Sequence, residues 1–217
     1  MNTYVERRGF ANEAEPVGLM TEGAAGIAVI VLAVIALAGV STDALTSIAA
    51  IVIGVGLMVQ AFNSAAEHSK MMTANAATGA HAAEFAGDVM VDCMCGLTGI
   101  VLGILALVGM GAAHLLPPAL IVFGGALLIG GAVSMRATTL PASASGSEAL
   151  GVTYQGSPAA GGMEILIGLA AIVLGILSML MTGTWVLVLV GFIAVGAALL
   201  LASATFNGAV MRLFTAA

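Results

Sequence analysis

The sequence predicts an all-α integral membrane protein with six transmembrane helices, arranged as three tandem helical hairpins around a pseudo-threefold axis. Two observations lead to this class. Of the 217 residues, 61% are hydrophobic and only 7% are charged, whereas about 25% are charged in an ordinary soluble domain. In addition, one pattern of glycines and acids occurs three times, with spacings of 70 and then 72 residues. The whole chain, 1–217, is therefore expected to form a single membrane domain.

The repeat is built around an Ile-Val-Leu-small sequence whose small residue is Ala33, Gly103 or Gly175. A first glycine stands seven residues before the small residue. An acid stands four residues before this first glycine, and a second glycine stands 28 residues after the first. These positions hold Gly26, Gly96 and Gly168, then Glu22, Asp92 and Glu164, then Gly54, Gly124 and Gly196. A fixed period is typical of a repeated structural unit. The sequence thus predicts repeats at 22–63, 92–136 and 164–207, with linkers at 64–91 and 137–163.

Six segments are each apolar for roughly 17 to 22 residues, the length that a helix needs to cross a bilayer core of about 30 Å. They lie near 23–40, 44–63, 95–112, 117–135, 162–181 and 185–206. None shows the in/out alternation that a membrane barrel requires, so helices are predicted throughout.

Taken in order, the segments between the spans differ in character. Residues 1–22 are polar and acidic, a poor match to a signal peptide, so the first span is expected to stay in the membrane. Residues 64–91 are rich in alanine and predict helical continuation with a break near Gly79. Pro117 and Pro118 are expected in the first turn of the fourth span, where proline is tolerated. Residues 137–161 are rich in Ser, Gly and Pro and predict a flexible linker. Trp185 suits the membrane interface at the start of the sixth span.

All basic residues lie in the N-terminal segment, in or directly beside the two linkers, or in the C-terminal tail; they are Arg7, Arg8, Lys70, Arg136 and Arg212. Basic residues mark the cytoplasmic side of membrane proteins. The sequence therefore predicts a multi-pass protein of a prokaryotic-type inner (cytoplasmic) membrane with both termini in the cytoplasm.

Small residues are predicted to bring the helices together. Two spans per repeat mean that every copy enters the membrane in the same direction, and parallel copies are related by rotation about the membrane normal. Gly99 and Gly103 form a GxxxG pair, and Ala171 and Gly175 are its counterpart in the third copy. Such pairs allow close approach of helix backbones in lipid. The predicted helix-packing residues are Gly26, Gly54, Gly96, Gly99, Gly103, Gly124, Gly168, Ala171, Gly175 and Gly196.

The acids Glu22, Asp92 and Glu164 have two interpretations. Each would lie in the first turn of an odd-numbered helix, where the helix dipole stabilises a negative charge by roughly 0.3–1 kcal/mol. Alternatively, three carboxylates crowded around the axis would form a proton or cation site at the cytoplasmic mouth. The first interpretation is favoured, and the second stays open.

Other polar groups give weaker indications. His68, His81, Cys93 and Cys95 lie near four methionines and include ligand types for Cu(I) or Zn, but Cys-x-Cys alone is weak evidence. A lone His114 in an outer turn is a weak candidate for a pH sensor. No nucleophile–base pair, phosphate loop or metalloprotease motif occurs, so neither an enzyme nor a cofactor is predicted. No basic patch suits nucleic acid.

Residues 96–107 and 168–179, and less closely 26–37, resemble the HdeD-like family of small six-span inner-membrane proteins built from a short repeated unit. The resemblance implies a role in acid or envelope stress and offers no catalytic residues.

Two functional hypotheses follow. The first is a non-enzymatic structural or accessory membrane protein that binds itself or other membrane subunits, in the HdeD-like version protecting the membrane under stress. The second is a small channel or transporter for a neutral solute or protons near the axis. Spans without a central charge favour the first, because ion-coupled transporters usually need one.

Overall fold

The computed structural model of this protein describes residues 23–74, 79–139, 158–181 and 185–215, where all regular secondary structure is helical. The helices are Gly23–Leu37, α2 (Thr42–Ala74), α3 (Gly79–Leu107), α4 (Ala112–Thr139), α5 (Pro158–Leu180) and α6 (Trp185–Thr215). Helices α2 to α6 are each long and apolar enough to cross a membrane, whereas Gly23–Leu37 is shorter over its described residues. The chain is an all-helical, multi-pass membrane protein, as predicted, with five full-length spans in the described part.

The segment between the first two predicted repeats is largely helical, as predicted. Helix α2 continues beyond its apolar span to Ala74, and α3 begins at Gly79, before its own apolar span. Residues 64–74 contain neither glycine nor proline, and seven of the eleven are Ala, Met, Glu or Lys, which favour helix. The predicted break near Gly79 agrees with the start of α3, and most of the second predicted linker, 140–157, lies outside the described residues.

Helix α4 corrects the prediction for the two prolines. It begins at Ala112, so Pro117 and Pro118 lie inside the helix and not in its first turn. A helical proline leaves the carbonyl four residues earlier without its amide partner. Here those carbonyls belong to Ala113 and His114, which are exposed at the end of the helix. Water or lipid headgroups can therefore satisfy them, and the helix tolerates both prolines.

Two turns between consecutive helices share one backbone design. Gly39 has φ 87° and Gly109, 70 residues later, has φ 94°. The amide of Gly109 donates to the Ala106 carbonyl (3.1 Å) and the amide of Met110 donates to the Leu105 carbonyl (3.1 Å), which is the Schellman arrangement at a helix C-terminus. Ser41 has φ 39° at the position that corresponds to Gly111, where φ is 81°.

We predict that Gly109→Ala lowers the stability of the full chain by about 1 kcal/mol, because an L side chain is disfavoured at positive φ. A Cβ at Gly109 would meet nothing within 4 Å, so only backbone strain contributes. Ser41→Gly should have the opposite sign, since it relieves the same strain. Thermal unfolding in detergent measures both. Equal melting temperatures for Gly109→Ala and the wild type would contradict the assignment.

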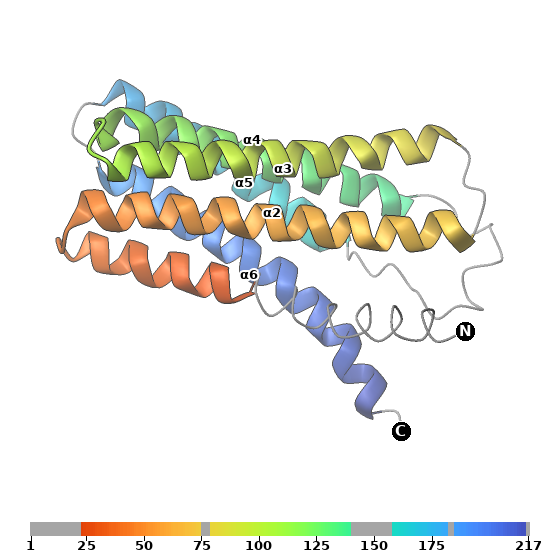
Figure 1. Cartoon of the computed structure of the whole chain (residues 1–217). Coiled ribbons are helices and arrows are strands. Elements are labelled where there is room, and N and C mark those ends of the chain that lie inside the picture. The colour runs from red at the N-terminus through yellow and green to blue at the C-terminus, as the bar shows by residue number, and fades with distance from the viewer. Residues whose placement is uncertain (1–22, 75–78, 140–157, 182–184, 216–217) are drawn as a thin grey trace, which may run out of the picture.

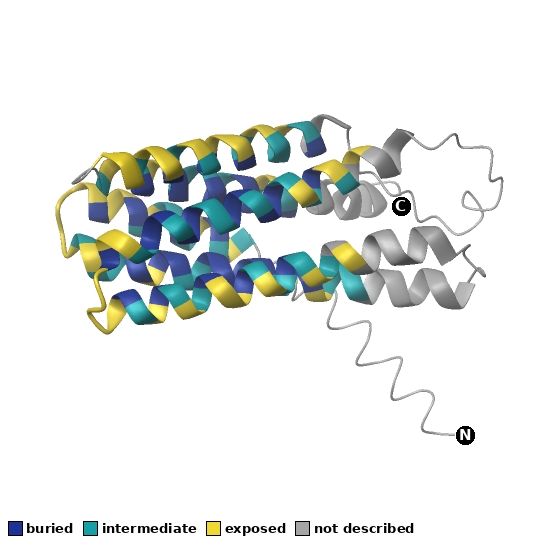
Figure 2. Cartoon of the chain, turned by 90° about the horizontal axis from the view of Figure 1, so that it is seen from above, coloured by how far each residue is buried: buried dark blue, intermediate teal, exposed yellow. Residues whose placement is uncertain are grey.

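The helices pack side by side in a bundle (Figures 1 and 2). Helices α2, α4 and α6 contact one another, whereas α3 and α5 do not touch each other within the described residues. In the most apolar 18 residues of each span, 50% are buried in α2, α4 and α6, against 28% in α3 and 17% in α5. The second helix of each predicted hairpin is thus the inner one.

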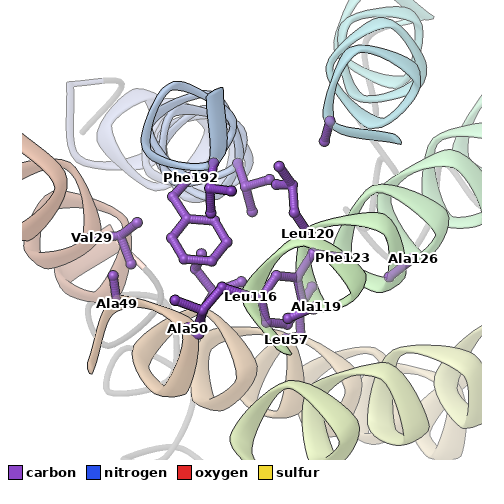
Figure 3. Packing of buried hydrophobic residues seen from close by; sticks show 14 of the residues in the cluster. Val29, Ala49, Ala50, Leu57, Leu116, Ala119, Leu120, Phe123, Ala126 and Phe192 are labelled. Atoms are coloured by element: carbon purple, nitrogen blue, oxygen red, sulfur yellow. The ribbon is translucent and has the colours of Figure 1, made fainter. Parts of the chain in front are cut away.

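Large apolar side chains fill the space between the inner helices. Figure 3 shows residues of Gly23–Leu37, α2, α4 and α6 meeting in one cluster, with Phe123 and Phe192 as its largest members. The two rings have centroids 6.2 Å apart and planes inclined by 59°, a tilted geometry that aromatic pairs favour. The centre of the bundle is therefore packed with hydrocarbon at this level.

Candidate functional site

Three pairs of glycines hold the outer helices against the inner ones, and we call these contacts the glycine seams. They are Gly54–Gly96 between α2 and α3, Gly124–Gly168 between α4 and α5, and Gly196–Gly26 between α6 and the Gly23–Leu37 helix. A Cβ placed on the first glycine of each pair would lie 2.5, 2.6 or 3.1 Å from the carbonyl oxygen of the second. Such close backbone approach is possible only without side chains.

The seams extend along the helices at intervals of seven residues. Seven residues after Gly96, Gly103 faces the Ser47 carbonyl of α2, where an added Cβ would lie 2.9 Å from the oxygen. In the α4–α5 seam, Gly131 and Gly161 make a second glycine pair, seven residues from the first on each helix. A seven-residue spacing keeps one stripe of a helix against its neighbour and is typical of left-handed crossing.

The predicted GxxxG pair does not act as one surface. Gly103 faces α2, whereas a Cβ on Gly99 would lie 2.2 Å from Cε1 of Phe123 on α4. Residues four apart on a helix differ in direction by about 40°, and that rotation is enough for them to meet different neighbours. Ala171 and Gly175 are both buried, and Gly175 faces the Pro117 carbonyl and Ile121 of α4.

Two of the three predicted acids lie in the described part, at different seams. Asp92 on α3 is only 4% exposed, and Glu164 on α5 is half-buried. Each precedes a seam glycine by four residues and so shares its helical face. The Cβ of Glu164 lies close to Gly131: a Cβ added to Gly131 would be 3.0 Å from the Cβ of Glu164. Both acids take part in hydrogen bonds or electrostatic interactions.

A common proton or cation site for the three acids remains a prediction. The helices that carry Asp92 and Glu164 do not contact each other within the described residues, and Glu22 lies outside them. Each described acid is therefore placed at the contact between an outer helix and an inner helix.

The candidate metal ligands give no cluster in the part of the chain with described side chains. Cys93 and Cys95 are free, half-buried thiols on α3. The side chains of His68 and His81 lie outside the described residues. Among the residues searched, no group of three His, Cys, Asp or Glu side chains could hold a metal ion. His114 is exposed near the start of α4.

Two polar residues of α2 carry a signal that the sequence analysis missed. Gln60 Oε1 and Asn63 Nδ2 are buried and have no hydrogen-bond partner. By contrast, the buried hydroxyls of Ser47 and Ser203 donate to the carbonyls of Asp43 (2.6 Å) and Leu200 (2.8 Å). The signal in the sequence is positional: Gln60 stands three residues after Leu57, where the other two repeats have Gly130 and Ala202.

Comparisons of the chain with protein families, with curated proteins and with solved structures found no match. The resemblance of residues 96–107 and 168–179 to HdeD-like proteins therefore remains a prediction from those residues. The seams and the buried amides are properties of this chain itself.

Proposed function

We propose that this chain is a non-enzymatic structural or accessory subunit of a prokaryotic-type inner membrane, folded as three hairpins about a pseudo-threefold axis. The observation that carries the proposal is the interior, which is built for packing. Residues buried between the inner helices are mostly apolar or small, and Phe123 and Phe192 fill their centre.

The pseudo-threefold arrangement is supported by the order of the seams. Each seam joins the second helix of one repeat to the first helix of the next, and the third seam joins the last helix to the first. Equivalent inner positions are also equally buried: Leu57, Leu127 and Leu199 are 1%, 4% and 1% exposed. Seams of this kind hold three modules together through close packing of helix backbones.

The apolar surface open to partners includes the outer faces of α3 and α5, beside that of the Gly23–Leu37 helix. Exposed apolar side chains recur there at intervals of three and four residues, which places them on one helical face. On α3 they are Met90, Met94, Leu97, Val101 and Ile104, and on α5 they are Leu166, Leu169, Val173, Ile176 and Leu180. Lipid covers such faces, and so do the helices of a second copy or another subunit.

The positions of the basic residues support cytoplasmic termini. The HdeD-like resemblance supports a role in acid or envelope stress as the specific form of the proposal. The runner-up function is passage of a neutral solute or protons near the axis, and the large side chains packed there argue against it.

We predict that the tagged full chain, crosslinked in its native membranes and gently solubilised, runs in species larger than its own 21.3 kDa. Bands at multiples of that mass would indicate self-association, and other masses would identify a subunit by mass spectrometry. A bulky pair of substitutions on one outer face, Leu97→Trp with Val101→Trp, should reduce the crosslinked fraction severalfold if α3 is the contact. The matched pair on the other helix, Leu169→Trp with Val173→Trp, should reduce the crosslinked fraction if α5 is the contact.

The companion measurement is solute and proton flux in liposomes that contain the purified chain. We expect rates no higher than in empty liposomes. Recovery of a lone 21.3 kDa species, together with flux faster than in empty liposomes, would contradict the accessory role and favour the channel.

A further inference from the structure

Part-way along the inner helices, one layer of residues differs from the hydrocarbon packed around Phe123 and Phe192. We call the end of the bundle where α2 and α4 finish the linker end. Leu57, Leu127 and Leu199 lie buried in one cluster, on the part of each inner helix that leads toward this end. One helical turn closer to the linker end, the corresponding residues are Gln60, Gly130 and Ala202, which are half-buried. Two of the three inner helices thus carry almost no side chain there, and the third carries an amide.

Asn63 belongs to the same layer. It follows Gly56 by seven residues and so lies on the same face of α2, two turns further on. A Cβ at Gly56 would lie 3.2 Å from Cδ1 of Leu199 and 3.5 Å from Cβ of Ala25. That face of α2 is turned toward α6 and the Gly23–Leu37 helix, and it carries the amide of Asn63.

The two amides leave complementary atoms unpaired. Gln60 Oε1 accepts hydrogen bonds and Asn63 Nδ2 donates them, and both are buried without a partner. The residues are three apart on one helix, with Cβ atoms roughly 5–6 Å from each other. Asn63 Nδ2 could donate a hydrogen bond to Gln60 Oε1, but in this structure neither atom has a partner. Buried polar atoms nearly always have a partner, and one small bridging group between the two amides would give a partner to both atoms.

We propose that Gln60 and Asn63 bind one neutral hydroxyl group, supplied by water or by a lipid glycerol, between α2 and the neighbouring inner helices. The hydroxyl donates its hydrogen to Gln60 Oε1 and accepts a hydrogen bond from Asn63 Nδ2. A hydroxyl fits because one such group can donate to an amide oxygen and accept from an amide nitrogen at the same time. The site is independent of the proposed accessory role, since it rests on two atoms of α2.

A double-mutant cycle on the full chain tests the site. Gln60→Met and Asn63→Leu keep side-chain volume and remove the polar atoms. Each single variant leaves the hydroxyl with one partner, so each should lower the melting temperature by roughly 2–4 °C. The double variant removes both partners and should fall no further than either single one, because residues sharing one ligand are not additive. Additive losses, or single variants that melt no lower than the wild type, would overturn the site.

Two arms distinguish the source of the hydroxyl. Non-additivity in delipidated detergent micelles indicates water. Non-additivity that appears only when monoolein, a glycerol ester with free hydroxyls, is added indicates lipid. The control cycle pairs Asn63→Leu with Thr98→Val on α3, whose hydroxyl donates to the Met94 carbonyl (2.7 Å); this pair should be additive in both media.

A density map provides a second readout if the variants fail to fold. Ordered density within hydrogen-bond distance of both Gln60 Oε1 and Asn63 Nδ2 supports the site. A direct hydrogen bond between the two amides refutes it.

Discussion

Gly124→Ala is expected to destabilise the full chain by about 2–3 kcal/mol, because one added methyl overpacks a contact between two backbones. The new Cβ would lie 2.6 Å from the Gly168 carbonyl oxygen, 2.8 Å from Cγ1 of Ile172 and 3.0 Å from the Ile172 amide nitrogen. Two of these atoms belong to the backbone of α5 and cannot rotate away. The two helices must therefore separate. Thermal unfolding in detergent should show a melting temperature lower by roughly 6–10 °C.

The neighbouring glycine provides the matched control. A Cβ at Gly125 would meet nothing within 4 Å, so Gly125→Ala adds no clash and improves helix propensity. We expect it to melt at or above the wild-type temperature. Similar losses for both variants would mean that the chain responds to alanine in general and that the α4–α5 glycine seam does not exist.

Gly99→Val is expected to cost about 3 kcal/mol, because it places a branched side chain where the Phe123 ring lies. An added Cβ would be 2.2 Å from Cε1 and 2.3 Å from Cζ of that ring. A flexible neighbour could move, but Phe123 is fully buried and has no space to enter. The melting temperature of the single variant measures the loss.

The other repeats indicate how to repair the defect. The positions equivalent to Gly99 and Phe123 hold Val29 and Ile53 in the first repeat, and all four residues are buried. We expect the double variant Gly99→Val with Phe123→Ile to recover about half of the loss or more, since it copies a pair that the chain already uses. Gly87→Val on the same helix, where a Cβ meets nothing within 4 Å, is the control and should be nearly silent. A double variant less stable than Gly99→Val alone would show that Phe123 is not the obstacle.

Several properties could be predicted because local composition decides them. Apolar runs long enough to span a bilayer predict helices whatever their neighbours, and α2 to α6 follow them. The alanine-rich segment after the second span also predicted that the helix continues, and α2 runs past its apolar part to Ala74. The start of α4 was predicted less well: this helix begins at Ala112, before its prolines. The hydropathy of a segment predicts which part lies in lipid, whereas helix propensity decides how far the helix extends beyond that part.

The packing partners of single residues could not be predicted from spacing. The glycines at 26, 54, 96, 124, 168 and 196 were singled out by their recurrence, but a recurrence does not say which glycine meets which. The structure pairs each one with a glycine of another repeat. Gly99 and Gly103 likewise share a motif and contact different helices, because a small rotation along the helix changes the neighbour.

The sequence by itself determined that this chain is helical, spans a membrane and carries one glycine pattern three times. Only the tertiary structure decided that α2, α4 and α6 lie inside, that Phe123 and Phe192 fill the centre, and that Gln60 and Asn63 have buried, unpaired atoms. The reason is physical: solvent preference and backbone propensity act on each segment alone, whereas burial and hydrogen-bond satisfaction depend on which side chains the folded helices bring together.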